Sequence, residues 1–323
     1  MLTDSHGRRF EYLRLSVDDA CNFRCLYCLP KGFVKTDEEP PLSVEEARRL
    51  VTAFAAMGFW KVRLTGGEPT TRQDIVELAS AVASVEGIRK VALSTNGYRL
   101  KELAAPLSRA GVSAVNVSVD SLIPERFAEI TGHNRLHDAL KAVDECIDLG
   151  LDAKVNVVLL KDKNDDELAA FMEYAKPRKI SVRFIELMPT ADNADFFAER
   201  HLKSAAIVPP LLAAGWTERE RAPGSGPARV FGHPQYKGTL GLIAPYEKNF
   251  CDHCNRLRVT SRGRLRLCLF AEGEFSLRPW LQRDEQSREL QKVVTDLVVK
   301  KEISHYLDQG RLGDTKHFAS MGG

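Results

Sequence analysis

The sequence lacks any long apolar run and carries almost no net charge. No stretch approaches the ~20 consecutive apolar residues of a membrane-spanning helix, so we expect no membrane protein. The opening residues MLTDSHGRRFEY contain no apolar segment, so we expect no secretory signal. A net charge of +2 is too small to indicate a nucleic-acid-binding protein, and any cationic site must be local. These absences predict a cytoplasmic protein, in a compartment where thiols stay reduced.

Cysteine is also scarce, but its seven residues are not scattered. Six of them form two triplets, Cys21, Cys25 and Cys28 near the start of the chain and Cys251, Cys254 and Cys268 near its end. The seventh, Cys146, lies in the helix-like segment RLHDALKAVDECIDLG, where we expect an inert, buried thiol. In a reducing compartment, clustered cysteines indicate a metal or catalytic site before a disulfide. Neither triplet has a fourth sulfur nearby.

Short β-rich segments alternate with amphipathic segments from residue 11 to about residue 186. The predicted strands are EYLRLSV (11–17), KVRLT (61–65), KVALST (90–95), VSAVNVSV (112–119), DAKVNVVLL (152–160) and ISVRFIE (180–186). The predicted helices are SVEEARRLVTAFAAMG (43–58), DIVELASAVASVEG (74–87), LKELAAPLSRAG (100–111), RLHDALKAVDECIDLG (135–150) and NDDELAAFMEYA (164–175). Repeated strand–helix units favour a parallel sheet, and six units are two short of a complete eightfold barrel.

The predicted strands alternate apolar and polar residues, although a strand covered on both faces should be apolar almost throughout. Val62 and Leu64, for example, alternate with Lys61, Arg63 and Thr65. One face can therefore pack under helices while the other carries polar groups. An antiparallel sheet with one hydrated face is an alternative, but the intervening helices favour a wide barrel with a polar lining. We predict an α/β fold, an incomplete (β/α)6 TIM-like barrel whose cavity takes a polar ligand.

The pattern changes after residue 187. ERAPGSGPARVFGHPQYKGTLG is rich in Gly and Pro and indicates loops and short strands, whereas NRLRVT and RLRLCLF flank SRG and predict a hairpin. We place a boundary near residue 190. The partial barrel (1–190) would carry the first triplet, and a smaller C-terminal α+β extension (191–323) would carry the second.

Each triplet can be interpreted as an incomplete ligand set. Three thiolates can hold three irons of a [4Fe–4S] cluster, which leaves the fourth iron open to a small molecule. Zinc completed by a distant histidine is the alternative for the first triplet. For the second, the alternative is a zinc knuckle with His253 or another histidine, although a histidine inside the CxxC is poorly placed to chelate the same metal. A second three-sulfur cluster with an open iron fits this set better.

The CxxxCxxC arrangement, with Tyr27 before its last cysteine, resembles the signature of the radical S-adenosylmethionine (SAM) superfamily. Gly66-Gly67-Glu68-Pro69, after the second predicted strand, resembles the stretch that lies beside the methionine amino group in that superfamily, although glycines also serve simple turns. The resemblance implies that the open iron chelates SAM. An electron from the cluster then cleaves SAM to a 5′-deoxyadenosyl radical, which abstracts hydrogen from the substrate.

Almost the whole chain resembles the GTP 3′,8-cyclase family of molybdenum cofactor biosynthesis, the MoaA family. The matching segments run in order from LRLSVDDACNFRCLYCLP through RLTGGEPTTR, LSTNG, VNVSVDSL, KVNVV and VRFIELM to FCDHCNRLRVTSRGRLRLCLF and the final Gly322-Gly323. The resemblance implies a lyase with SAM and two [4Fe–4S] clusters that converts GTP to (8S)-3′,8-cyclo-7,8-dihydroguanosine 5′-triphosphate. It also implies a low-potential electron donor, a homodimer, and cyclic pyranopterin monophosphate synthase as the next enzyme.

The resemblance extends to individual site residues. The implied SAM contacts are Tyr27, Gly67, Ser118 and Met188. The implied GTP contacts are Arg14, Arg63, Ser94, Lys154, Arg256, Leu257 and Arg258, to which the strand pattern adds Lys61 and Arg183 as weaker candidates. Arg256, Arg258, Gly322 and Gly323 are implied to act in catalysis, the glycine tail by reaching into the active site. Met188 could instead fill a gap in the core.

The charge pattern agrees with a triphosphate substrate, because several cations are needed to neutralise about four negative charges. Two other functions remain open. One is a two-cluster radical SAM enzyme acting on a peptide or another small molecule, although a polybasic cavity disfavours a peptide. The other is an iron–sulfur electron carrier or a zinc-stapled binding module, for which the GGEP stretch and the polar barrel lining would have no use.

Overall fold

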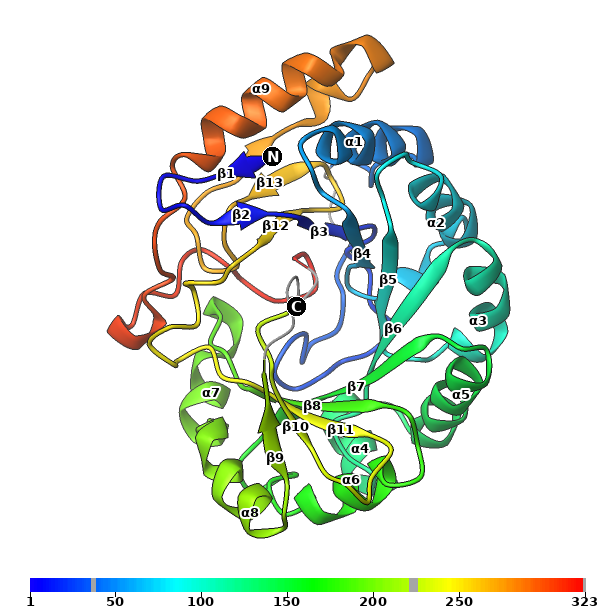
Figure 1. Cartoon of the computed structure of the whole chain (residues 1–323), viewed down its shortest axis with the longest axis vertical. Helices are drawn as coiled ribbons and strands as arrows, with labels where there is room; N and C mark the ends of the chain where they lie inside the picture. The colour runs from blue at the N-terminus through cyan, green and yellow to red at the C-terminus, as the bar shows by residue number, and fades with distance from the viewer. Residues whose placement is uncertain (36–38, 221–225, 322–323) are drawn as a thin grey trace.

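One mixed sheet carries the fold in the computed structural model, which describes residues 1–35, 39–220 and 226–321 (Figure 1). Its strand order is β14-β13-β12-β3-β4-β5-β6-β7-β8-β11-β10-β9. The central six strands are β3 (Tyr12–Ser16), β4 (Lys61–Thr65), β5 (Lys90–Thr95), β6 (Val112–Ser118), β7 (Asp152–Leu159) and β8 (Ser181–Glu186). Each pairs in parallel with the next. The six predicted strands are thus confirmed, and the antiparallel alternative is wrong for this part of the chain.

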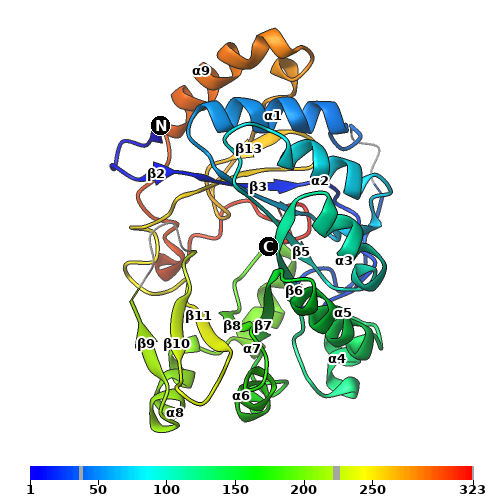
Figure 2. The same ribbon diagram turned by 45° about the vertical axis from the view of Figure 1, so that its right-hand side comes forward.

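Helices cover the outer face of the curved sheet (Figures 1 and 2). They are α1 (Val44–Ala56), α2 (Ile75–Ala83), α3 (Leu100–Arg109), α4 (Pro124–Thr131), α5 (Leu136–Asp148) and α6 (Leu168–Ala175). The five predicted helices are confirmed. The sequence analysis did not predict α4.

The apolar residues of the alternating strands face these helices. Leu13 of β3 and Val62 and Leu64 of β4 are fully buried and belong to one core with Phe54 of α1. The polar residues between them face the inner side of the sheet, as the alternation predicted. None of the helices in the described ranges combines the length and the apolar character of a membrane span.

The C-terminal part of the chain joins both edges of this six-stranded sheet. β11 (Thr239–Ile243) pairs in parallel with β8, and β12 (Arg256–Val259) pairs in parallel with β3. Antiparallel strands continue the sheet outward on the two sides, as β10 (Arg229–Gly232) and β9 (Thr217–Arg219) and as β13 (Arg264–Arg266) and β14 (Phe275–Ser276). The predicted hairpin is confirmed as β12 and β13. The division near residue 190 stays a prediction, and the two parts it separates share one open sheet.

The remaining elements lie outside this sheet. β1 (Leu2–Thr3) and β2 (Arg9–Phe10) form a small antiparallel pair. The other helices are α7 (Ala194–Arg200), α8 (Val208–Ala213) and α9 (Ser287–Val298). Short 3-10 helices span Pro69–Thr71, Ala191–Asn193, Ser204–Ile207, Arg278–Trp280, Asp284–Gln286 and Leu307–Gln309. α9 lies against α1 at the outer surface (Figure 1).

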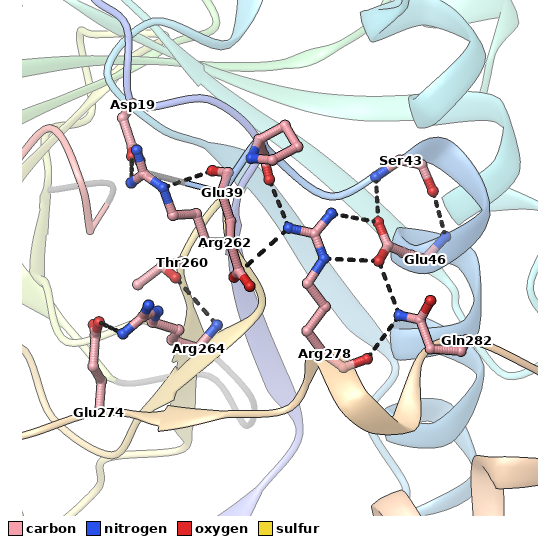
Figure 3. A network of polar contacts seen from close by, with 11 residues as sticks. Asp19, Glu39, Ser43, Glu46, Thr260, Arg262, Arg264, Glu274, Arg278 and Gln282 are labelled. Carbon is pink, nitrogen blue, oxygen red and sulfur yellow. Dashed lines mark hydrogen bonds and ion pairs between the residues drawn. The ribbon is translucent and has the colours of Figure 1, made fainter. Parts of the chain in front are cut away.

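A polar network fastens the start of α1 to the C-terminal extension (Figure 3). Ser43 and Glu46 form the predicted capping box, in which the Glu46 carboxylate accepts a 2.9 Å bond from the Ser43 backbone N–H. The same carboxylate accepts bonds from the Arg278 guanidinium at 2.9 and 3.0 Å and from the Gln282 amide at 3.2 Å. Glu46 therefore joins a helix cap in the barrel to residues more than two hundred positions away.

Replacement of Glu46 by alanine is expected to lower the free energy of unfolding by about 2 kcal/mol, because it removes both carboxylate bonds from the partly buried Arg278, which keeps the Pro40 carbonyl at 2.8 Å and the more distant Glu39 carboxylate at 3.9 Å. Burial alone would raise the pKa of Glu46, but the bonds from Arg278, Ser43 and Gln282 lower it below the usual 4.5. The contribution of the Glu46 carboxylate to the free energy of unfolding should therefore be complete above pH 4.5 and lost as the pH falls through the lowered pKa.

Urea unfolding of the wild type and of Glu46→Ala, at neutral and at acid pH, measures the lost stability. The matched control is Glu45→Ala, whose side chain is 59% exposed and bonds Arg48 at the surface of the same helix. It should cost well under ~1 kcal/mol. Equal losses for the two variants would contradict the assignment.

Candidate active site

The first cysteine triplet lies in the loop after β3, at the carboxyl ends of the central strands. Cys21, Cys25 and Cys28 line a cavity of about 170 Å³. All four residues predicted to contact SAM line the same cavity, namely Tyr27, Gly67, Ser118 and Met188. Seven predicted residues from four separate stretches of sequence therefore surround one small space. Their individual roles remain predictions.

The three thiols of this triplet resist ionisation. Burial raises the pKa of Cys21 to about 11 and that of Cys28 to about 12. Burial, together with the negative charges of Asp120 and of the neighbouring thiols, raises the pKa of Cys25 well above its usual value. Such thiols become thiolates when a bound cation supplies the missing positive charge. A partly buried set of three thiols around one cavity fits the donor set of an iron–sulfur cluster.

The GGEP stretch supports the triplet loop directly. A Cβ atom on Gly67 would lie 2.3 Å from the carbonyl oxygen of Ala20, and one on Gly66 would lie 2.2 Å from that of Asp18. The buried carboxylate of Glu68 accepts bonds from Thr95 Oγ1 at 2.7 Å and from the Asn96 backbone N–H at 2.6 Å. The stretch is therefore more than a turn, because it joins the loops that follow β3, β4 and β5.

Asp120 is a residue of this site that the sequence analysis did not single out. Its carboxylate accepts a 2.9 Å bond from the Tyr27 hydroxyl and a 2.8 Å bond from the Val158 backbone N–H. Burial raises its pKa to about 6. Asp120 follows β6 in VNVSVDSL on the polar side of the alternation, and this position was the signal available in the sequence.

A second cavity, of about 390 Å³, lies inside the curved sheet and is strongly basic. Seven predicted cations line it: Arg14, Lys61, Arg63, Lys154, Arg183, Arg256 and Arg258. Lys90 and Lys301 line it as well, and Asp152 is the one carboxylate among the described lining residues. The polar strand faces thus form the predicted cavity for a polar ligand.

Burial, together with the crowding of like charges, perturbs these cations. Burial, followed by the charge of Arg183, lowers the pKa of Lys154 to about 8, although Asp152 opposes the shift. Burial and neighbouring arginines lower the pKa of Arg14 and of Arg183 to about 10. A bound polyanion would relieve this repulsion.

Several buried polar atoms in the second cavity lack a partner. Nε of Arg183 and the Oδ1 atoms of Asn116 and Asn156 form no hydrogen bond with any described residue. All three side chains line the cavity, and buried polar groups are ordinarily satisfied. They therefore offer one donor and two acceptors to a ligand, and neither asparagine was among the predicted contacts.

The second cysteine triplet faces this basic cavity. Cys251, Cys254 and Cys268 line it together with His305, whereas His253 is exposed. Burial opposes ionisation of Cys254, but the charges of Arg256 and Lys301 lower its pKa to about 7. Within the described ranges, no three His, Cys, Asp or Glu side chains converge as they would around a single metal ion. The metal held by this triplet stays a prediction.

The two cavities adjoin each other. Asn156, Ile185 and Met188 line both of them, so they form a shared wall between the smaller cavity and the basic cavity. The chain thereby brings its two cysteine triplets, more than two hundred residues apart in sequence, to neighbouring spaces.

The other predicted contacts are distributed around these cavities. Ser94 lines the smaller cavity and accepts a 3.1 Å bond from Nη1 of Arg63. The Leu257 side chain lies in the core on the opposite face of β12, so only its backbone could meet a ligand. Gly322 and Gly323 lie outside the described residues. The segment before them reaches the site, because Phe318 lines the smaller cavity and the Met321 carbonyl accepts a 3.2 Å bond from Arg258.

Two sequence families match successive parts of the chain. Residues 15–175 match the Radical SAM superfamily, and residues 180–307 match Molybdenum Cofactor Synthesis C. A GTP 3′,8-cyclase of Stenotrophomonas maltophilia (strain K279a) is 53% identical over 323 residues, which are 100% of this chain and 99% of the relative. A GTP 3′,8-cyclase of Synechococcus elongatus is 49% identical over 325 residues, with 100% of this chain and 99% of the relative covered.

Solved structures show a likeness in fold. The crystal structure of Streptococcus suis SuiB bound to S-adenosylmethionine has a TM-score of 0.64 at 13% sequence identity, and the match covers 90% of this chain and 68% of that one. At a sequence identity this low, the likeness is evidence for the fold alone. It agrees with the open, incomplete barrel observed here.

Proposed function

The chain belongs to the GTP 3′,8-cyclase family of the radical SAM superfamily, and from this premise we propose which reactant each of its two cavities binds. The enzyme cyclises GTP to (8S)-3′,8-cyclo-7,8-dihydroguanosine 5′-triphosphate in molybdenum cofactor biosynthesis. This assignment depends on one observation: the two cavities adjoin each other, and each is lined by a cysteine triplet. One triplet lies beside a glycine loop, and the other lies beside many cations.

In the proposed arrangement, Cys21, Cys25 and Cys28 hold the reducing [4Fe–4S] cluster, and the SAM contacts are Tyr27, Gly67, Ser118 and Met188. A cluster held by these three thiolates would supply the electron for the reductive cleavage of SAM. Gly67 lets the GGEP stretch pack directly on the backbone of the triplet loop, and Asp120 holds the Tyr27 ring through its hydroxyl.

The basic cavity is the proposed GTP site. Its cations neutralise the triphosphate, and Arg side chains can bind phosphate oxygens through two parallel N–H bonds. The unpartnered atoms of Arg183, Asn116 and Asn156 complete their hydrogen bonding on the nucleotide. A position beside the shared wall brings the ribose toward the SAM site.

We further propose that Cys251, Cys254 and Cys268 hold a second [4Fe–4S] cluster whose open iron anchors the purine. The positive surroundings of Cys254 support thiolate ligands at this end of the cavity. Cytoplasmic location, a low-potential electron donor, a homodimer and cyclic pyranopterin monophosphate synthase as the next enzyme are also part of the proposal.

Anaerobic reconstitution with iron, sulfide, GTP, SAM and a reductant tests this function. One hydrogen atom leaves ribose C3′ and one electron with one proton returns to the nucleotide, so the product is an isomer of GTP. We expect a new nucleotide of unchanged mass that separates from GTP by chromatography, together with an equimolar amount of 5′-deoxyadenosine. Deuterium at C3′ should appear in the deoxyadenosine.

The peptide-modifying alternative makes a different prediction. A peptide enzyme would cleave SAM without consuming GTP and would not bind GTP in equilibrium titrations. The cavity disfavours it, because nine cations line the described walls against one carboxylate. Absence of GTP binding by the reconstituted protein would falsify the proposed substrate.

A further inference from the structure

Tyr12 is a buried phenol in the middle of the cationic cavity. It begins β3, is 5% exposed and lines the cavity. It shares the inner face of β3 with Arg14, two residues further along. In the sheet register it lies between Arg256 of β12 and Lys61 of β4. A phenol therefore interrupts a row of cations.

The phenol contacts three of the surrounding cations. Its oxygen accepts a 2.6 Å bond from Nε of Arg63, and the Arg14 guanidinium is close enough for its charge to lower the pKa of the phenol. Nζ of Lys61 lies 4.4 Å from the centre of the ring, in the geometry of a cation–π contact. One side chain thus touches neighbours on its own strand and on the next.

Arg63 shows what the phenol contributes. Its Nη1 donates to the Leu93 carbonyl and to Ser94 Oγ, both at 3.1 Å, while its Nε donates to Tyr12. These three bonds fix the orientation of the Arg63 guanidinium. Arg14 and Arg63 lie opposite each other in the register of β3 and β4, where their like charges repel. The Tyr12 oxygen, an acceptor beside both charges, holds the Arg63 guanidinium in place against this repulsion.

The electrostatic surroundings of the phenol support this interpretation. Burial by itself would raise the pKa of Tyr12, but Arg63, Arg14 and Lys61 lower it to about 7. The hydroxyl therefore experiences a strong positive field, and it stabilises the cations in return.

We propose that Tyr12 is a positioning residue for the phosphate groups of the substrate, because its oxygen holds the Arg63 guanidinium in the orientation that receives them. The inference rests on the proposed GTP site and deepens it. Tyr12 acts through this arginine, so its removal should weaken recognition of phosphate and leave recognition of the nucleoside unchanged.

Tyr12→Phe, which deletes only the hydroxyl, tests the proposal. We measure the Kd values of GTP, GDP, GMP and guanosine by calorimetry with the anaerobically reconstituted enzyme. The Kd of GTP should rise ~10-fold, the loss should shrink as phosphates are removed, and guanosine should bind as it does to the wild type. KM for GTP should rise more than kcat falls. An equal loss for guanosine and GTP, or no loss at all, overturns the proposal.

A double-mutant cycle separates positioning from a general structural effect. If Tyr12 acts through Arg63, adding Tyr12→Phe to Arg63→Gln should weaken GTP binding no further, whereas additive losses contradict the proposal. Tyr236→Phe is the matched control, because that hydroxyl bonds Glu173 at the surface, and its GTP affinity should equal that of the wild type. Wild-type protein that binds no GTP would instead refute the proposed function, so the two failures are distinguishable.

Discussion

Replacing Cys268 by serine is expected to abolish GTP cyclisation yet leave reductive cleavage of SAM measurable, whereas replacing Cys25 should abolish both. Each loss follows from the cavity that the thiol lines: Cys25 lies beside the glycine loop of the proposed SAM site, and Cys268 lies in the basic cavity. Serine keeps the size of the side chain but is a poor ligand for iron in a cluster. The same chemical change should therefore have two different outcomes.

Assays of 5′-deoxyadenosine and of cyclised nucleotide on anaerobically reconstituted variants measure the two activities. Iron and sulfide analysis should show that each variant loses one cluster, ~4 irons per chain. Cys146→Ser is the matched control, because Cys146 is fully buried in the core away from both cavities. It should retain both activities and both clusters. Wild-type cyclisation by the Cys268 variant would show that no second cluster is needed.

Replacing Arg258 by alanine is expected to lower the rate of cyclisation at least ~100-fold while SAM cleavage stays detectable, a loss of about 3 kcal/mol of stabilisation. Arg258 lies opposite Arg14 in the register of β12 and β3, and burial with nearby arginines lowers its pKa well below the usual value. It also bonds the Met321 carbonyl at 3.2 Å. One side chain thus links the basic cavity to the C-terminal segment. Arg256→Ala should have a similar effect.

The variants separate charge from geometry. Arg258→Lys keeps the charge but loses the planar fork of donors, so we expect only partial recovery. Arg264→Ala is the control, because Arg264 lies on the neighbouring strand β13, is 39% exposed and bonds Glu274. It should cyclise GTP at the wild-type rate. Unchanged cyclisation in both the Arg256 and Arg258 variants is the outcome that contradicts their role at the substrate.

Much of the site was predictable because its signals are local. The spacing of Cys21, Cys25 and Cys28 is a property of eight consecutive residues. The inward position of Arg63 follows from an alternation within a five-residue strand. The same alternation, extended back by one step from Arg14, would have identified Tyr12. That residue was missed because tyrosine carries no charge and is common in buried strands.

Other residues could not be found in this way. Lys301 and His305 lie after α9, in a stretch with no strand period, and only the packing of that stretch brings them to the basic cavity. The sequence also did not show which later strands pair with the two edges of the six-stranded sheet. β12 pairs with β3 across more than two hundred residues, and the open edge of a six-unit barrel gives no sign of which later strand will cover it.

The amino-acid sequence by itself determined the strand–helix order, the polar inner face of the sheet and the two sets of thiols, because each depends on residues close together along the chain. Tertiary structure decided how these parts meet. It placed strands from the C-terminal part on both edges of the sheet, made the two cavities neighbours and set Tyr12 among the arginines. The physical reason is that hydrogen bonding between strands and the burial of apolar faces act on whichever surfaces remain open, wherever in the chain they occur.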